Sequence, residues 1–133
     1  MDKIQQSQIV AFMKRYRFRG GRLRRFRVQT QSAQRSSGEI VVSVRETESD
    51  KRLRLRLVLE NVEEYRFQRR PGTGIVRLKE VRLGYFNGSF FLNFDAFPED
   101  GPPSLIDFRA SDAFIAAQTI SWEIVPSKAK PKS

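Results

Sequence analysis

The clearest pattern along the chain is a strict alternation of apolar and basic residues between positions 51 and 60. Leucine occupies positions 53, 55, 57 and 59, and the intervening residues are Arg52, Arg54, Arg56 and Val58. Side chains alternate between the two faces of a strand, whereas on a helix these leucines would surround the axis and form no stripe. The pattern therefore predicts a strand that buries its leucines and exposes its arginines.

Shorter patterns of the same kind predict further strands. Ile40, Val42 and Val44 alternate with more polar residues before a loop over 46–51. Asn87-Gly88 predicts a hairpin turn, because both residues tolerate positive φ. Other strands are expected at 23–28 with a bulge, at 65–67 after a corner at 61–64, at 75–86 with a break near 79–80, at 90–97, at 105–110 and at 114–125. Residues 29–38 and 71–74 are expected to be connections. Ser111-Asp112-Ala113 could instead begin a short helix that ends at Ala117.

The beginning of the chain has a helical spacing of apolar residues. Ile4, Ile9, Phe12 and Tyr16 belong to one apolar face, which predicts a helix over 3–16 with Asp2 as its cap. Gly20-Gly21 is expected to stop this helix.

One helix and about eight strands with short connections predict a mainly β fold. We expect an antiparallel β-sandwich or a strongly bent sheet, because no helices separate the strands as a parallel sheet would require. A single domain is expected over 1–126, in which 1–19 form the N-terminal helix and basic segment. Residues 127–133 are expected to be a basic, disordered tail without an apolar anchor.

Composition narrows the chemistry that the chain can support. The 133 residues include neither Cys nor His, which excludes disulfides, Cys/His zinc sites, haem ligation by these residues and a histidine base. The acidic residues of the second half match no calcium loop; they are Asp95, Glu99, Asp100, Asp107 and Asp112. We expect a protein that is not an enzyme and that has no cofactor. No long apolar run follows the initial Met, so a cytoplasmic location without a membrane span is expected.

The net charge of +10 is concentrated at the beginning of the chain. Residues 1–30 carry a net charge of +8, whereas residues 87–127 carry −5. Such polarity could steer an anionic partner to the basic part, or let two ends of one or two molecules face each other. Arginine outnumbers lysine eighteen to seven, and guanidinium groups bind carboxylate or phosphate as two-pronged forks.

Two groups of arginines are the candidate binding residues. The first is interleaved with Tyr16, Phe18 and Phe26, a mixture that is typical of single-stranded nucleic-acid binding. The alternative is that these aromatic side chains belong to the core and that the arginines line a solvent-exposed strand face. The second group projects from the leucine strand, where Glu39, Glu46 and Glu60 could neutralise it. Together the candidates for binding an anion or a partner are Arg15, Arg17, Arg19, Arg22, Arg24, Arg25, Arg27, Arg52, Arg54 and Arg56.

A run of phenylalanines suggests an additional contact surface. Phe90, Phe91, Phe94 and Phe97 lie on both faces of one expected strand. If one face packs on the core, the other needs a helix, a neighbouring strand or a partner. A homodimer is therefore a further prediction.

The order of elements resembles that of small bacterial β-sandwich proteins of unknown function, which include some immunity proteins of polymorphic-toxin systems. The residues that carry this resemblance are 53–59, the step Leu57-Val58-Leu59-Glu60-Asn61-Val62, and the closing Ile120-Ser121-Trp122-Glu123-Ile124. Leu59 stands where Phe is usual in that step, and Phe18-Arg19-Gly20-Gly21 stands where many of those proteins have Phe-His-Asp. The resemblance implies a non-enzymatic protein that binds another protein.

Two functional hypotheses follow from these patterns. The first is a non-enzymatic protein-binding module, such as an immunity-like protein or an assembly component, with an unknown and acidic protein partner. The alternative is binding of nucleic acid or another polyanion through the basic N-terminal segment, and its affinity would fall steeply with salt.

Overall fold

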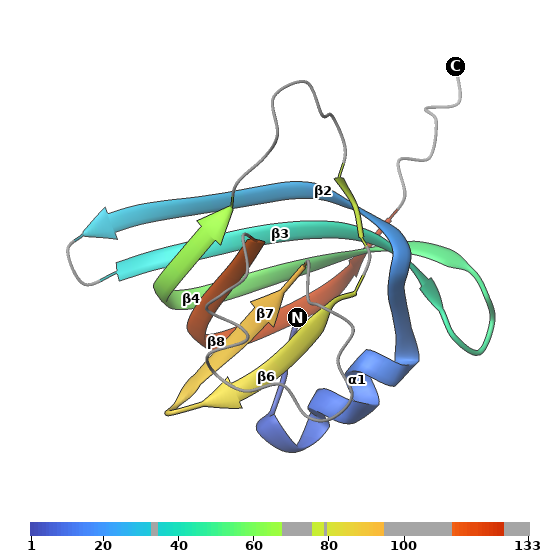
Figure 1. Ribbon diagram of the computed structural model, residues 1–133, viewed down its shortest axis with the longest axis horizontal. Coiled ribbons are helices and arrows are strands. Elements are labelled where there is room, and N and C mark those ends of the chain that lie inside the picture. The colour runs from blue at the N-terminus through green and yellow to red at the C-terminus, as the bar shows by residue number, and fades with distance from the viewer. Residues whose placement is uncertain (33–34, 68–75, 79, 95–112, 127–133) are drawn as a thin grey trace.

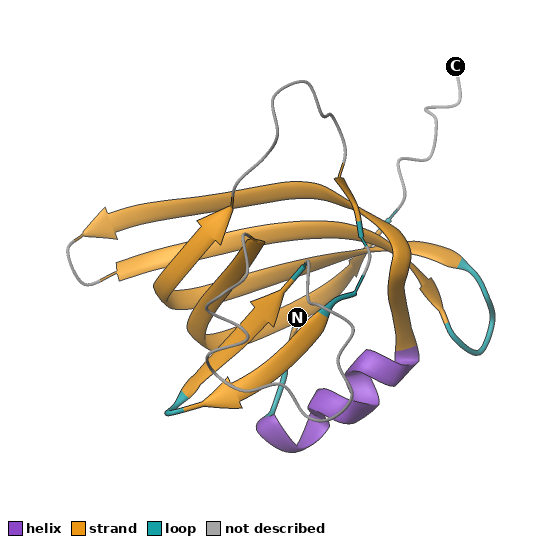
Figure 2. Ribbon diagram, in the orientation of Figure 1, coloured by secondary structure: helices purple, strands orange, loops and turns teal. Residues whose placement is uncertain are grey.

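Strands make up most of the part of the chain that the computed structural model describes, namely residues 1–32, 35–67, 76–78, 80–94 and 113–126 (Figures 1 and 2). The strands are β1 (Asp2–Lys3), β2 (Tyr16–Ser32), β3 (Arg35–Glu46), β4 (Arg52–Phe67), β5 (Val76–Arg77), β6 (Arg82–Phe86), β7 (Ser89–Asn93) and β8 (Ala113–Val125). A 3₁₀ turn (Gln6–Gln8) leads into the short helix α1 (Ile9–Arg15), which lies beside the start of β2 (Figure 1). The predicted mainly β fold with one N-terminal helix is confirmed.

The described strands form one antiparallel sheet in the order β5-β2-β3-β4-β8-β7-β6, and β1 also pairs with β8. The four long strands curve together across the molecule (Figure 1). The sheet is open, because its edge strands β5 and β6 do not pair with each other. No second, separate sheet occurs among the described residues.

The predicted apolar faces of β3 and β4 meet in the core. Ile40 is paired with Leu57 and Val42 with Leu55, and all four side chains are at most 1% exposed. Complete burial of a side chain of this size contributes about 1.5–3 kcal/mol. The inner face is therefore the one that the leucine alternation predicts, and the arginines of β4 lie on the opposite, outer face.

The predicted helix over 3–16 is too long at its beginning. Asp2 and Lys3 form β1 and pair with Trp122 and Ser121 of β8, so Asp2 does not cap the helix. The Ile4 amide donates to the Ile120 carbonyl at 2.8 Å, which extends this attachment. Pairing with a distant strand satisfies backbone groups that a first helical turn would leave without partners.

Gly20-Gly21 does not end the helix, which already ends at Arg15. Both glycines lie inside β2, in an irregular stretch between the pairs Arg17–Arg45 and Arg22–Ser43. Gly20 has a φ of +85°, which L side chains rarely adopt. A bulge needs the same backbone freedom as a helix stop, and local sequence does not distinguish the two.

The polar segment 29–38 is also not a loop at its described residues, 29–32 and 35–38. β2 extends to Ser32 and β3 begins at Arg35, and Thr30 is paired with Ser36 in a long hairpin. Backbone hydrogen bonding in a sheet needs no apolar side chain, so a two-stranded arm can be polar.

Other predictions around β4 and β8 have mixed outcomes. The corner at 61–64 is a bulge within a continuous β4, and Asn61 has a φ of +57°. The Asn87-Gly88 turn is confirmed, with positive φ at both residues. The alternative helix through Ala117 is wrong, because 113–117 belong to β8. The predictions for 71–74, 95–112 and 127–133, including the acidic residues Asp95, Glu99, Asp100, Asp107 and Asp112, lie outside the described residues.

The phenylalanines of β7 are buried within the single chain. Phe90 belongs to the main core, whereas Phe91 packs with Phe114, Ala116 and Phe86 in a second cluster. The exposed aromatic face that motivates a homodimer is therefore not found at the described positions, and the homodimer stays a prediction. None of the helices in the described part of the chain has the length and apolar character needed to span a membrane.

Candidate anion-binding face

The outer face of β2, β3 and β4 gathers most of the predicted arginines. Antiparallel register aligns Arg22 with Ser43 and Ser43 with Arg54, so these positions form one row across three strands. Arg17, Arg45 and Arg52 form the next row. Neighbouring strands are about 4.8 Å apart, so the long side chains of adjacent rows are within reach of one another. We call this surface the arginine face; its residues are Arg17, Arg19, Arg22, Arg24, Arg25, Arg27, Arg45, Arg52, Arg54 and Arg56.

Arg15 is not part of the arginine face. It lies at the end of α1, where its guanidinium carbon is 5.1 Å from the ring centroid of Tyr16 and 5.6 Å from that of Trp122. This geometry is a cation–π contact with the rings beneath the helix. The fold therefore directs Arg15 toward the helix and away from the other predicted arginines.

One part of the arginine face is neutralised by carboxylates. Glu39 of β3 accepts hydrogen bonds from Arg25 at 2.9 Å and from Arg56 at 2.7 Å, and Arg56 also donates to Glu123 at 3.0 Å. The hydrogen bond from Arg56, followed by that from Arg25, lowers the pKa of the Glu39 carboxyl group. The hydrogen bond to Glu39 raises the pKa of Arg56. The prediction that Glu39 neutralises the arginines of the leucine strand is therefore confirmed for Arg56, but not for Arg52 or Arg54.

The two other predicted acids do not take that role. The Glu46 carboxylate accepts a hydrogen bond from Ser49 at 2.7 Å, and no described ion pair joins Glu46 or Glu60 to the arginines of β4. Glu123, which the sequence analysis missed, replaces them.

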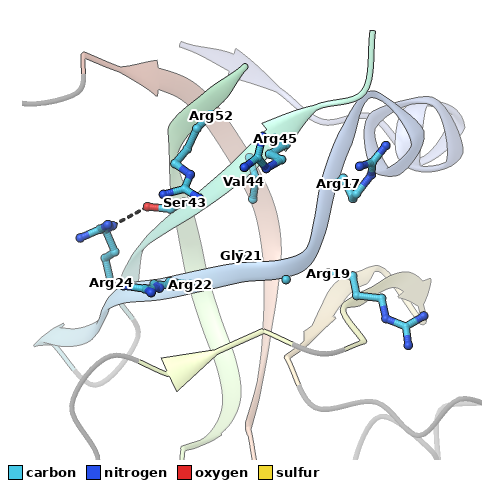
Figure 3. A pocket seen from close by; sticks show the side chains of 10 residues that line it. Arg17, Arg19, Gly21, Arg22, Arg24, Ser43, Val44, Arg45 and Arg52 are labelled. Carbon is cyan, nitrogen blue, oxygen red and sulfur yellow. Dashed lines mark hydrogen bonds between the residues drawn. The ribbon is translucent and has the colours of Figure 1, made fainter. Parts of the chain in front are cut away.

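The other part of the arginine face forms a pocket of about 170 Å³ around Ser43 (Figure 3). We call it the Ser43 pocket; its lining residues are Arg17, Arg19, Gly20, Gly21, Arg22, Arg24, Ser43, Val44, Arg45 and Arg52. Arg24 Nε donates a hydrogen bond to Ser43 Oγ. Figure 3 shows Arg24 and Arg52 reaching toward Ser43 from two strands, while Arg19 points away.

Positive charge in the Ser43 pocket is only partly balanced. Asp50 lies 4.0 Å from Arg17 and 3.5 Å from Arg45, at the edge of the pocket. Among the described residues, no carboxylate lies within 4.0 Å of the guanidinium groups of Arg22, Arg24, Arg52 or Arg54. Burial, followed by the charges of Arg54, Arg22 and Arg52, lowers the pKa of Arg24. The arrangement therefore concentrates cationic donors without matching anions.

The irregular stretch of β2 shapes this pocket. A Cβ atom at Gly21 would overlap the Ser43 carbonyl oxygen and lie 2.9 Å from that of Phe18, so only glycine fits there. The Gly20 amide donates to the Leu78 carbonyl at 2.9 Å, and the Leu78 amide donates to the Gly21 carbonyl at 2.8 Å. These bonds hold the bulge against the chain that follows β5.

The aromatic residues interleaved with the arginines lie in the core. Tyr16 and Phe18 are 0% and 4% exposed, and Phe26 stacks on Phe67 with a centroid distance of 4.6 Å. Burial raises the pKa of the Tyr16 hydroxyl. Tyr16 and Phe18 are therefore not available for stacking on nucleic-acid bases. The alternative interpretation is confirmed for Phe18 as a core residue, whereas Phe26 is partly buried and packs against the core.

Sequence analysis did not select Ser43 and Arg45 as site residues, although a signal for them existed. The alternation of Ile40, Val42 and Val44 places both on the polar face of the same strand. Glu123 had no such signal, because its position opposite Arg56 depends on the pairing of β4 with β8.

Within the described residues, no group of His, Cys, Asp and Glu side chains could hold a metal ion. Comparisons of the chain with protein-family models, with curated proteins and with solved structures each gave no match. The function is therefore inferred from the geometry of the arginine face.

Proposed function

We propose that the protein is a non-enzymatic binding module that docks a carboxylate-rich surface of another protein on its arginine face. The observation that carries this proposal is the alignment of arginines from three neighbouring strands on one side of the sheet, with cationic excess at the Ser43 pocket. A binding role also agrees with the resemblance to immunity proteins, and an immunity-like or assembly function is part of the proposal.

Carboxylates are favoured as partner groups because the protein already binds its own carboxylates in this way. Glu39 lies between Arg25 and Arg56, and Arg56 lies between Glu39 and Glu123. An acidic partner can extend this alternation of charges into the rows that lack acids. Guanidinium forks make paired, directed hydrogen bonds to carboxylates, which gives such an interface geometric specificity.

Nucleic acid is the competing partner, and it fits the same face less well. Binding of single strands normally combines backbone neutralisation with stacking of bases on aromatic rings. By its definition the arginine face contains no aromatic residue. Of the nearest candidates in sequence, Tyr16 and Phe18 are buried in the core, and Phe26 is partly buried against it. Only electrostatic attraction between the arginines and the nucleic-acid phosphates would remain. This attraction would not depend on base sequence, and salt would weaken it strongly.

The experiment is capture of partners from an extract of the source cells by the immobilised protein and two charge-matched variants. R22Q/R52Q removes two charges from the Ser43 pocket, and K3Q/K14Q removes two charges from exposed lysines outside the arginine face. We expect a stoichiometric acidic protein with the wild type and the lysine variant, and its loss with R22Q/R52Q. The captured protein is identified by mass spectrometry and its binding is then measured with purified components.

Two outcomes would contradict the proposal. Recovery of nucleic acid without a stoichiometric protein would favour the alternative function. Equal loss of the partner in both variants would show that net charge, and not the arginine face, determines binding.

A further inference from the structure

We propose that the Ser43 pocket is a specific site for a tetrahedral, doubly charged oxyanion of the phosphate class. The inference rests on the proposed function in one respect: a side chain of the docked protein can carry the phosphoryl group. Free phosphate presents the same chemistry to the pocket, and the two sources are separated by the experiment below.

Register brings the required donors together from three strands. Arg22 and Arg24 belong to β2, Ser43 to β3 and Arg52 to β4, and all four line the pocket. Arg54 of β4 lies beside Ser43 in register. Ser43 is paired with both Arg22 and Arg54, so it lies at the centre of the group. The outer two strands are separated by about two strand spacings, roughly 10 Å, which extended arginine side chains can bridge over Ser43. Figure 3 shows this convergence for Arg24 and Arg52.

Charge distinguishes this group from the neighbouring row of the same face. Beside Glu39, Arg25 and Arg56 each have a carboxylate oxygen within 3.0 Å. Around Ser43, the charges of Arg22, Arg52 and Arg54 lie close enough to Arg24 to affect its ionisation. Among the described residues, no carboxylate lies within 4.0 Å of any of these four guanidinium groups. A bound anion would relieve this mutual repulsion and hold the side chains in one arrangement.

The number and direction of the donors favour phosphate over carboxylate. A carboxylate offers two oxygen atoms in one plane and a single charge, whereas a phosphoryl group offers three oxygens in three directions and nearly two charges at neutral pH. Donors that approach from β2 on one side and from β4 on the other match the second geometry. A carboxylate bound there would leave guanidinium charge unbalanced.

The Ser43 hydroxyl supplies a donor of a different kind at the centre. Its oxygen accepts the hydrogen bond from Arg24 Nε, so its proton can be donated to an anion in the pocket. Ser43 is only 5% exposed, which places this hydroxyl at the base of the site. The volume of about 170 Å³ is ample, since one water molecule needs about 10–15 Å³ of such space.

The experiment is calorimetric titration of the full chain with sodium phosphate at about pH 7.5, where phosphate is largely a dianion. Ionic strength is kept constant with sodium chloride, and sodium acetate serves as the carboxylate probe. We expect saturable binding of one phosphate per chain, with acetate weaker by about tenfold or more. R22Q/R52Q is expected to weaken phosphate binding by about tenfold or more, S43A by severalfold, and K3Q/K14Q by less than about twofold.

A second titration separates the two sources of the phosphoryl group. An acidic peptide with one phosphoserine is compared with its serine counterpart and with free phosphate. Tighter binding of the phosphopeptide, dependent on Arg22 and Arg52, assigns the site to a modified partner side chain. Equal affinity for free phosphate and phosphopeptide assigns it to the free ion.

The inference is wrong if phosphate binding does not saturate, or if acetate binds as tightly as phosphate. It is also wrong if K3Q/K14Q and R22Q/R52Q lose phosphate affinity equally while urea unfolding shows that both variants are folded. If phosphate fails but capture of an acidic protein still depends on Arg22 and Arg52, only this inference fails. If phosphate binds but no protein is captured, only the proposed function fails.

Discussion

Replacement of Gly21 by alanine tests the link between the β2 bulge and the stability of the fold. The new Cβ would meet backbone atoms of Ser43 and Phe18, and neither can rotate away as a flexible side chain would. To relieve this overlap, β2 must move away from β3 at Gly21, which also disturbs the hydrogen bonds between the bulge and Leu78.

The expected magnitude combines two effects. Overpacking in a well-packed region costs about 1–3 kcal/mol. The hydrogen bonds from the Gly20 amide to the Leu78 carbonyl and from the Leu78 amide to the Gly21 carbonyl would be weakened, at about 0.5–1.5 kcal/mol each. We therefore expect G21A to lower the free energy of unfolding by about 2–6 kcal/mol, a large part of the total for a domain.

G20A is the matched control. Gly20 also lies in the bulge, but a Cβ there has no atom within 4 Å, so only its φ of +85° is unfavourable. That conformation costs an alanine about 1–2 kcal/mol. Unfolding in urea, followed by far-UV circular dichroism and by the fluorescence of the single tryptophan, gives the three free energies. If G21A is no less stable than G20A, the close approach of Gly21 to β3 does not exist.

Three further predictions concern the ion pairs, the core and the helix. E39Q removes the negative charge and one of the two acceptor oxygens beside Arg25 and Arg56, and it should lower stability by about 1 kcal/mol at neutral pH. Because the folded-state pKa of Glu39 is lowered, its contribution is present above about pH 4.3 and is lost as pH falls through the folded value, so urea midpoints of wild type and variant should converge in acid. L57A should lower stability by about 2–5 kcal/mol, whereas V58A on the outer face should lower it by less than about 1 kcal/mol, and equal urea midpoints would refute this strand orientation. R15Q should change the emission of Trp122 and lower stability by about 0.5–1 kcal/mol, and an unchanged spectrum would contradict the cation–π contact.

Sequence periodicity predicted the sheet where local pattern and tertiary burial agree. The alternation around Leu55 and Leu57 allows only one orientation of the strand, because a one-residue shift would place the leucines in water and the arginines in the core. The arginine face follows from the same alternation. Periodicity therefore predicts the members of the arginine face on β2 and β4, although it does not predict that β3 lies between these two strands.

The remaining features depend on contacts that are distant in sequence. Gly20-Gly21 has the same local signal whether it stops a helix or forms a bulge, and pairing with Ser43 and Leu78 decides between them. Likewise, Asp2 has the side chain of a helix cap, but pairing with β8 makes it part of a strand. The partner of Arg56 could not be identified, because strand order is not encoded by periodicity.

The position of β8 in the sheet has a consequence for biosynthesis. β8 follows all the other described strands in the chain, yet it lies between β4 and β7 and also carries β1. Until residues 113–125 have left the ribosome, β4 and β7 each expose an unpaired edge, and the β6–β7 hairpin has no attachment to the larger part of the sheet. Such edges are templates for association with other chains. The nascent protein should therefore depend on chaperones until translation has passed β8, because the sheet cannot be completed before this strand is free to pair.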